Sequence, residues 1–393
     1  MPSSRPEIGR PELCRHLRQE ADRAARNGTA LALLQLQFPD GAPATVIHPL
    51  EGMLRSYDLL ARVGPGAYVA LLSDIRGGEA ALGTLVDRVQ AAVPTARIGV
   101  ATAGASPPAL LSAAAAACAA CAEDGQPTYH DPVLDAEMRR RRSFHADFAA
   151  AIAQGGIEVV YQPLYGPGNE SPVGVEALAR WTHRGKPVPP PEFIGHAERT
   201  GLIHALGEFV LEKACSDGLR WDDLTVAVNV SPAQLRDPAF PERVEAILRR
   251  TGFPAGRLEI EVTETVLARD PEAVAARLTR LQEIGVKVAL DDFGTGFSGL
   301  GYLRTLPFDR IKIDRSFVND PGRQSQAIIE AVLGLSRTLG MSVTAEGIET
   351  AEQRELMVRA GCGRLQGYLL GRPAGAEAID ALLDLAPTGP GGP

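Results

Sequence analysis

The sequence KVALDDFGTGFS, at residues 287–298, joins an apolar stretch to two adjacent carboxylates and a glycine-rich turn. Its apolar part predicts a buried β-strand over Val286–Leu290, which ends at Asp291 and Asp292. The same arrangement recurs at Thr225–Val230, where Thr-Val-Ala-Val precedes Asn229. Barrel enzymes carry their chemistry at the carboxyl ends of such strands, so Asp291 and Asp292 are predicted to stand at the functional face of a barrel.

Short strands alternate with helix-length segments on both sides of this stretch, from Gly156 onward. Strands are predicted at Ile157–Gln162, Val173–Leu178, Thr225–Val230, Leu258–Val262, Val286–Leu290, Arg310–Ile313, Ser342–Ala345 and Arg364–Leu365. Helices are predicted at Pro191–Thr200, Leu202–Gly218, Pro241–Arg250, Pro271–Ile284, Ser325–Leu339 and Ala351–Ala360. Eight alternations over about 235 residues favour an α/β fold with a C-terminal (β/α)8 TIM-like barrel over an open sheet. The absence of a glycine-rich loop after the first strand argues against a dinucleotide-binding fold.

The N-terminal part predicts a smaller α+β domain. Strands are expected at Leu31–Phe38, Ala67–Leu72 and Ala96–Ala101, and helices at Glu12–Arg26, Gly78–Ala92, Pro108–Glu123 and Leu134–Ala153. The predicted domains are residues 1–132, a linker helix at 133–145, the barrel domain at 146–386 and a disordered Pro/Gly-rich tail at 387–393. The basic run Arg139–Arg142 is interpreted as a solvated helix face.

Composition excludes several classes of protein. The 393 residues are 45% hydrophobic and 22% charged, which is typical of folded domains. The net charge of −8 argues against a partner that is a nucleic-acid polymer. Five scattered cysteines indicate a reducing compartment, and the lone pair Cys118 and Cys121 is interpreted as apolar helix packing rather than a zinc or redox site. With no signal pattern and no span of about 20 apolar residues, we expect a soluble, cytoplasmic protein without a membrane partner.

Polar side chains stand at the end of nearly every predicted barrel strand. They are Glu176, Asn229, Glu261, Asp291, Asp292, Lys312, Glu346 and Gln366. Each alone is a weak signal, because a carboxylate at a strand end is most often a helix cap or a surface residue. Together they converge on one barrel mouth.

So many carboxylates at one mouth need an opposing charge, because like charges at short range raise each other's pKa. An all-oxygen ligand set suits Mg²⁺ or Mn²⁺ better than Zn²⁺. Five carboxylates exceed the need of one ion, so two metal ions about 3.5–4 Å apart, bridged by one aspartate, are predicted. The chain has 36 Arg and only 4 Lys, so a lysine at position 312, beside the acidic residues, goes against its preference and indicates a functional role for Lys312. The alternative is an ordinary exposed strand lysine.

The ordered motifs resemble those of EAL-domain phosphodiesterases over about residues 145–385. They are Tyr161–Pro163, Glu176–Trp181, Asn229–Pro232, Glu261–Glu264, Asp291–Ser298, Lys312–Asp314, Ala345–Glu349 and Gln366–Tyr368. The resemblance implies metal-dependent hydrolysis of cyclic di-GMP to linear pGpG, and a homodimer through the barrel domain. The alternatives are a catalytically silent cyclic di-GMP receptor, or an interaction scaffold that needs no acidic mouth.

The resemblance also implies a role for each matching residue. One metal would be held by Glu176, Asn229, Glu261 and Asp291, and the second by Asp291, Asp292 and Glu346. Lys312 and Glu346 would orient or deprotonate the nucleophilic water, and Glu264 would steady the Asp292–Ser298 loop. Substrate contacts would come from Gln162, Leu178, Arg180, Gln366 and Glu349; for Arg180 the alternative is a strand-end salt bridge.

Three features depart from the family pattern. Phe297 stands where tyrosine is usual, Leu164 stands where lysine is common, and the segment Thr182–Pro190 is short and rich in proline. None of them removes a metal ligand. We expect them to alter substrate affinity or loop closure rather than the chemistry.

The segment Leu31–Gly125 resembles the GGDEF diguanylate-cyclase domain that often precedes an EAL domain. Arg62–Tyr68 occupies the place of the R-x-G-G-D-E-F hairpin, with Gly66 and Ala67 replacing its acidic pair. The resemblance therefore implies a degenerate, regulatory domain without cyclase activity. Arg55 and Asp58 match the spacing of an R-x-x-D product-binding site and are a candidate allosteric site; the alternative is a surface pair of Asp58 and Arg62.

Overall fold

The computed structural model describes residues 10–38, 50, 52–55, 57–76, 78–102, 106–121, 126–168, 170–268, 270–294, 306–320 and 322–384. The chain forms two compact units, Met1–Phe144 and His145–Pro393, which are described separately below. The division falls inside one helix, α5 (Pro132–Ala153). The predicted tail at 387–393 lies outside the described residues.

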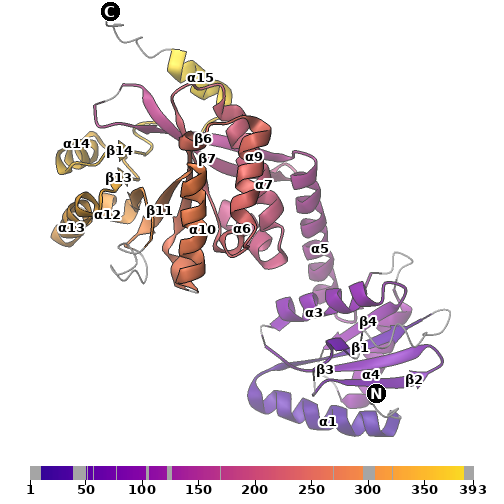
Figure 1. Cartoon of the computed structure of the whole chain (residues 1–393). Helices are drawn as coiled ribbons and strands as arrows, with labels where there is room; N and C mark the ends of the chain where they lie inside the picture. Colours follow the sequence, from indigo (N-terminus) through magenta and orange to yellow (C-terminus); the bar gives the residue numbers. More distant parts are fainter. Residues whose placement is uncertain are drawn as a thin grey trace, which may run out of the picture. The chain divides into compact units, whose positions relative to one another are not determined.

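The N-terminal unit is built on a five-stranded sheet of order β2-β3-β1-β4-β5. Its strands are β1 (Ala30–Gln37), β2 (Leu59–Gly64), β3 (Ala67–Ile75), β4 (Arg97–Thr102) and β5 (Thr128–Tyr129). Its helices are α1 (Arg10–Asn27), α3 (Gly78–Ala92), α4 (Pro107–Ala119) and the start of α5. Residues of α1 and α4 pack on one face of the sheet, and residues of α3 and α5 pack on the other (Figure 1). The two short strands β2 and β5 were not predicted, since their sequences lack a clear apolar alternation.

The C-terminal unit is a closed barrel, because the sheet order β6-β14-β13-β12-β11-β10-β9-β7 returns to its start through a β6–β7 pairing. Its strands are β6 (Ile157–Tyr165), β7 (Pro172–His183), β9 (Thr225–Asn229), β10 (Leu258–Thr263), β11 (Lys287–Phe293), β12 (Arg310–Ile313), β13 (Ser342–Ala345) and β14 (Arg364–Leu365). The predicted closed α/β barrel of eight strands is thus confirmed. Strand β6 differs from a regular (β/α)8 barrel, because it runs antiparallel to both β7 and β14.

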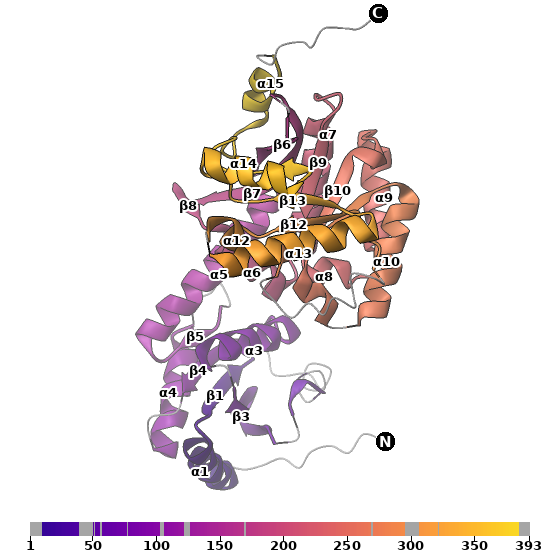
Figure 2. The same cartoon turned by 90° about the vertical axis from the view of Figure 1, so that its left-hand side faces the viewer.

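Helices cover the outside of this barrel (Figures 1 and 2). They are α6 (Pro190–Thr200), α7 (Ile203–Gly218), α8 (Pro232–Leu235), α9 (Phe240–Thr251), α10 (Pro271–Ile284), α12 (Arg315–Asn319), α13 (Arg323–Leu339), α14 (Ala351–Ala360) and α15 (Ala376–Asp384). Short α8, α12 and α15 were missed by the sequence analysis. The proline-rich segment after Thr182 forms a hairpin between β7 and β8 (Lys186–Val188).

Charged anchors tie the last helix to the barrel. Asp380 of α15 accepts hydrogen bonds from the Trp221 indole (2.8 Å) and from Arg220.

Within the described residues, no helix combines the length and apolar character needed to cross a bilayer.

Candidate active site

Lys312 is the centre of the polar cluster at the barrel mouth. Its side chain comes from β12 and is only 2% exposed. The ammonium Nζ lies 2.7 Å from Glu261 Oε2, 2.7 Å from Glu346 Oε1 and 3.2 Å from Asp291 Oδ1. A buried cation thus balances carboxylates from three other strand ends, as a compact point charge can.

Glu176 is held from three sides. Its Oε1 accepts a hydrogen bond of 2.6 Å from Asn229 Nδ2, and its Oε2 accepts one of 2.6 Å from Gln366 Nε2. The same Oε2 lies 3.9 Å from Lys312 Nζ. The Gln366 amide also donates to Gln162 Oε1 at 3.1 Å, so residues from β7, β9 and β6 meet there. These contacts fix the orientation of a carboxylate that is 6% exposed.

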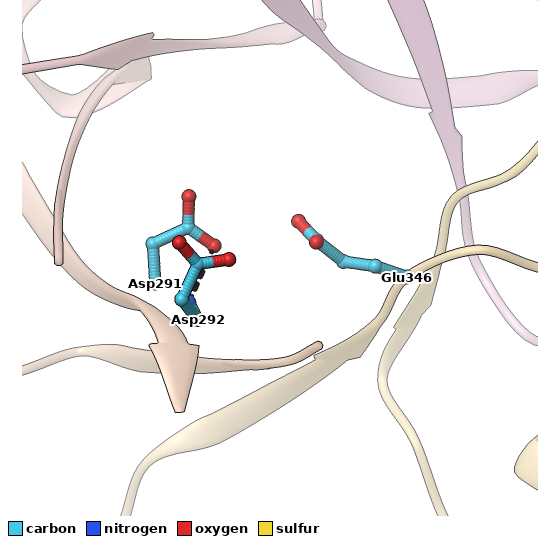
Figure 3. Close-up of side chains that lie close together, drawn as sticks. All are labelled: Asp291, Asp292 and Glu346. Carbon is cyan, nitrogen blue, oxygen red and sulfur yellow. Dashed lines mark hydrogen bonds between the residues drawn. The ribbon is translucent and has the colours of Figure 1, made fainter. Parts of the chain in front are cut away.

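Asp291, Asp292 and Glu346 form the open side of the cluster. One carboxylate oxygen from each lies within 4.8 Å of the other two, a spacing suited to a shared cation. Figure 3 shows the Glu346 carboxylate projecting toward the two aspartates. Oxygen-only donors of this kind match the preference of Mg²⁺ and Mn²⁺.

A backbone irregularity brings the two adjacent aspartates to the same opening. In a regular strand, successive side chains face opposite sides. Strand β11 continues through Phe293 rather than ending at Leu290, and its register with β12 shifts between Leu290 and Phe293. Asp292 has φ +53°, a conformation that costs a non-glycine residue about 1–2 kcal/mol, and its N–H donates to Asp291 Oδ1 at 2.9 Å. The predicted strand therefore ended three residues too early. The irregularity between Leu290 and Phe293 is a β-bulge that turns both carboxylates to the mouth of the barrel.

The protonation of the cluster follows from its burial and its charges. Burial raises the pKa of Glu346 to about 7 despite the attraction of Lys312. Burial also raises the pKa of Glu261 well above its usual range. For Lys312 burial acts to lower the pKa, but the surrounding carboxylates outweigh it and raise it well above the usual value. Burial and the Asp291 charge raise the pKa of Asp292. In the metal-free site one ammonium does not offset burial and the mutual repulsion of the carboxylates, so Glu346, Glu261 and Asp292 bind protons more tightly than usual.

Glu264 lies beside this cluster and anchors the chain after β11. Its Oε1 accepts the Gly294 N–H at 2.8 Å. Gly294 has φ +96°, and a Cβ there would lie 2.8 Å from the Phe317 ring, so the position requires glycine. The other carboxylate oxygen of Glu264 is buried without a hydrogen-bond partner among the described residues. Phe297 and the rest of the predicted loop through Ser298 lie outside those residues.

The predicted substrate contacts fall into two groups. Gln162, Leu178, Glu349 and Gln366 line one cavity together with Glu176, Asp291 and Glu346. Arg180 is not among the described residues that line it; its guanidinium donates to the Ala179 carbonyl at 2.9 Å. Arg180 lies two residues after Leu178 on β7, and its predicted contact with the substrate stays a prediction.

Sequence analysis missed part of the cavity wall, namely Arg315, Gly347, Gly367 and Tyr368. Gly347 and Gly367 directly follow Glu346 and Gln366, so the motifs already contained their signal. A Cβ on Gly347 would lie 2.3 Å from Arg315 Cβ, and one on Gly367 would lie 2.1 Å from the Ile348 carbonyl oxygen. These glycines allow two loops to pack closely behind the carboxylate and the amide.

The candidate allosteric pair in the N-terminal unit has structural contacts. Asp58 is 7% exposed, and its two oxygens accept the N–H groups of Ser73 (3.0 Å) and Arg55 (2.9 Å). The Arg55 guanidinium donates to Tyr57 Oη at 2.9 Å. The Asp58 carboxylate therefore holds the turn before β2 to the end of β3, which weighs against its availability for a ligand.

Two other sequence interpretations can be compared with the contacts. Cys118 and Cys121 are buried, with their thiols directed at the Arg97 and Ile98 carbonyls. Only Cys118 lies on the helix, however, because α4 ends at Ala119 and Cys121 packs from the segment after it. The basic run on α5 is paired with acidic neighbours in each case, Arg139 with Asp135, Arg140 and Arg141 with Glu137, and Arg142 with Asp87.

The chain is similar to known proteins over its barrel unit. A family profile described as "EAL domain" matches residues 145–373. An "Uncharacterized signaling protein" of Caulobacter vibrioides is 46% identical over 251 residues, 63% of this chain and 31% of that protein. The "Bifunctional diguanylate cyclase/cyclic di-GMP phosphodiesterase MucR" of Pseudomonas aeruginosa is 34% identical over 359 residues, 85% of this chain and 52% of that protein. The chain thus spans from a third to about half the length of these curated relatives.

A solved structure shares the fold. The "PaMucR Phosphodiesterase, c-di-GMP complex" is 38% identical, with a TM-score of 0.57, and the match covers 60% of this chain and 99% of that one. This match has the extent of the barrel unit. The related structure was solved as a complex with c-di-GMP.

Proposed function

Because this chain belongs to the EAL domain family, we propose that it is a metal-dependent phosphodiesterase that hydrolyses cyclic di-GMP to linear pGpG. The observation that carries the proposal is the complete cluster of carboxylates around Lys312, at the mouth of the barrel. A receptor that binds the dinucleotide without cleaving it has no need for this concentration of buried negative charge.

The donor set fits two divalent cations, Mg²⁺ or Mn²⁺. Glu176, Asn229, Glu261 and Asp291 would hold one ion, and Asp291, Asp292 and Glu346 the other. The fit is supported by the mutual approach of the last three carboxylates within 4.8 Å, and by the carboxyl pKa values raised when no ion is present. When bound, such a pair activates water and neutralises the phosphoryl oxygens.

The chain's own residues would position the reacting groups and hold protons. Glu346 Oε1 lies 2.7 Å from Lys312 Nζ, so a carboxylate and a charged ammonium face the same site. This pair would orient the attacking water, and Glu346 would accept its proton. Lys312 would also attract the negative phosphoryl oxygens into the mouth.

Gln162, Leu178, Glu349 and Gln366 would contact the dinucleotide, as they line the cavity beside the carboxylates. Glu264 would act as a positioning residue through its hydrogen bond to Gly294. Arg180 would contribute a phosphate contact, with its guanidinium exchanging the Ala179 carbonyl for a phosphoryl oxygen.

For the N-terminal unit we propose a regulatory, GGDEF-like role without cyclase activity. The segment Arg62–Tyr68 lies where β2 turns into β3, which is a hairpin as the resemblance requires. Gly66 and Ala67 supply no carboxylate for a nucleotide-bound metal. The 34% identity to MucR over 85% of this chain extends beyond the barrel and supports the assignment.

The test is a chromatographic assay of the full chain with cyclic di-GMP and Mn²⁺. We expect pGpG to form, EDTA to abolish its formation, and Glu261→Gln to reduce the rate by orders of magnitude while the protein stays folded. Binding of the dinucleotide without pGpG would identify a silent receptor. The absence of both binding and hydrolysis would overturn the proposed function.

We also propose that the chain forms a homodimer through the barrel domain, as the family resemblance implies. Light scattering on the full chain and on residues 145–393 should then give the mass of two chains in both cases. A monomeric mass for residues 145–393 would place the dimer contact elsewhere or exclude it.

A further inference from the structure

A second cluster of charged side chains is buried inside the barrel, away from the cavity described above. It consists of Glu259, Arg310 and Arg364, which we call the lower triad. Glu259 and Arg310 have side chains only 1% and 9% exposed, and the Arg364 side chain is 11% exposed. Arg310 Nε lies 3.1 Å from both Glu259 carboxylate oxygens, and Arg364 Nη1 lies 3.6 Å from Glu259 Oε2.

Each member of the lower triad stands two residues before a residue of the active site. Glu259 precedes Glu261 on β10, Arg310 precedes Lys312 on β12, and Arg364 precedes Gln366 directly after β14. Side chains two residues apart on a strand face the same side, about 6.6 Å from one another. The lower triad therefore lies one layer beneath the site residues, inside the same barrel.

The strands involved also alternate around the ring. In the order β14-β13-β12-β11-β10-β9-β7, the strands β14, β12, β10 and β7 are every second one. Alternate strands of a barrel contribute the four side chains of one layer. The upper layer is then Gln366, Lys312, Glu261 and Glu176, whose members contact one another at 2.6–3.9 Å.

The lower layer of the same four strands contains only three side chains. On β7 the residue below Glu176 is Gly174, where a Cβ would lie 2.3 Å from Thr225 Oγ1. The lower triad therefore connects β10, β12 and β14, which are the strands of this layer with a side chain at that level. Its two guanidiniums and one carboxylate leave an excess of one positive charge beneath the acidic mouth.

We propose that Glu259, Arg310 and Arg364 are positioning residues for the reaction, which set the height and spacing of Glu261, Lys312 and Gln366. This inference rests on the proposed function for its kinetic consequence. Hydrogen bonds between charged groups are directional, whereas an apolar layer tolerates sliding of one strand against the next. A buried ion network is by itself a weak source of stability, since apolar replacements of similar volume are often neutral or stabilising.

This contrast gives a test that separates positioning from stability. In the triple variant Glu259→Leu/Arg310→Met/Arg364→Met, an apolar layer replaces the whole network without leaving an unpaired charge. We expect its melting temperature to stay at or above that of the wild type, while kcat falls about 10- to 100-fold, as small misplacements of catalytic groups do. KM should change less than kcat, because Gln366 is the one predicted substrate contact that the lower triad positions.

Arg257→Met is the matched control. This half-buried arginine donates to the carbonyls of Leu224 and Gly218, both at 2.8 Å, and to the Trp221 carbonyl; its hydrogen-bond partners among the described residues include no site residue. It should lower the melting temperature and keep kcat. If the triple variant does not fold, Arg364→Met alone retains the Glu259–Arg310 pair, and a loss of kcat smaller than that expected for the triple variant is predicted.

A crystal structure of the variant gives a readout that does not depend on activity. Lys312 Nζ should move away from Glu261 Oε2, a contact of 2.7 Å in the wild type, or Gln366 from Glu176, a contact of 2.6 Å. Unchanged contacts, or wild-type kcat in the folded variant, would overturn the positioning role. If the wild-type protein does not hydrolyse cyclic di-GMP, the proposed function is contradicted instead. The crystal structure of the variant would still show whether the lower triad positions Glu261, Lys312 and Gln366.

Discussion

Lys312 determines the charge balance of the mouth when no metal is present. Its ammonium is within 4 Å of four carboxylates, from Glu176, Glu261, Asp291 and Glu346. Bound divalent cations would take over part of this role, because they supply the same kind of opposing charge. The lysine and the metals are therefore partly interchangeable for stability, but not for chemistry.

Lys312→Met should destabilise the metal-free protein by about 3–5 kcal/mol, the usual cost of leaving buried charges without their partner. Mn²⁺ should raise the melting temperature of the variant more than that of the wild type, while hydrolysis falls by orders of magnitude. Differential scanning fluorimetry in EDTA and in Mn²⁺ measures both effects. Equal melting temperatures in EDTA would show that Lys312 does not hold the carboxylates together.

The raised pKa of Glu346 gives the metal-free protein a definite pH dependence. A carboxyl group with a folded-state pKa of about 7, against 4.5 as its ordinary value, binds its proton more tightly in the folded than in the unfolded chain. Its contribution to stability is present below about pH 4.5 and is lost as the pH rises through 7. We therefore expect this contribution to the free energy of unfolding in EDTA to decrease from pH 5 to pH 8.

Urea denaturation at several pH values tests this dependence. Glu346→Gln should flatten the slope, because an amide has no proton to lose. Glu349→Gln is the control, since Glu349 is an exposed carboxylate at the same cavity and should leave the slope unchanged. A Glu346→Gln variant with the wild-type slope would refute the assignment of the titration to Glu346.

At the scale of elements, the loops after the strands set the geometry of the mouth. The bulge in β11 turns Asp291 and Asp292 to the same side. The loop after β13 depends on Gly347, which has φ +69° and lies against Arg315 at the start of α12. The bulge contains Asp291 and Asp292, and Gly347 directly follows Glu346, so a small backbone shift at either place displaces a carboxylate.

Gly347→Ala should therefore reduce kcat at least about 10-fold, because the new Cβ would lie 2.3 Å from Arg315 Cβ and push the neighbouring Glu346 out of place. Gly361→Ala is a matched control with φ +98° and open space around the Cβ position. It should lower the melting temperature by a similar backbone strain yet keep kcat. Steady-state kinetics and thermal unfolding of both variants decide the matter, and equal activities would argue against this loop as a determinant of Glu346.

At the scale of the whole molecule, the barrel contains everything that the proposed reaction needs. Its ring of strands closes through the β6–β7 and β6–β14 pairings inside the C-terminal unit. The Lys312 cluster and the lower triad also lie entirely within that unit. The N-terminal unit contributes no residue to these two clusters.

Residues 145–393 alone should consequently fold and hydrolyse cyclic di-GMP in the presence of Mn²⁺. Removal of the N-terminal unit should change the rate by a regulatory factor and leave the pGpG product the same. The chromatographic assay on both chains, with circular dichroism as the folding control, measures this. A folded but inactive barrel would show that the N-terminal unit is required for the chemistry.

Much of this arrangement could be predicted from local sequence. Apolar runs that end in a polar residue predicted the eight barrel strands, and the motifs predicted the donor residues around Lys312. The N-terminal predictions were less complete, since β2 and β5 are short and have no clear periodicity. The direction of β6 was not predicted either, although the short connection at residues 166–171 leaves no room for the crossover that parallel neighbours require.

The sequence by itself determined which side chains stand at the strand ends, since alternation and strand length are local properties of the chain. Only the tertiary structure decided which of them touch. Contacts across the barrel depend on the register of strands far apart in sequence, and a shift of one residue moves every side chain to the other face. That register places Glu261 against Lys312, and Glu259 against Arg310 one layer below.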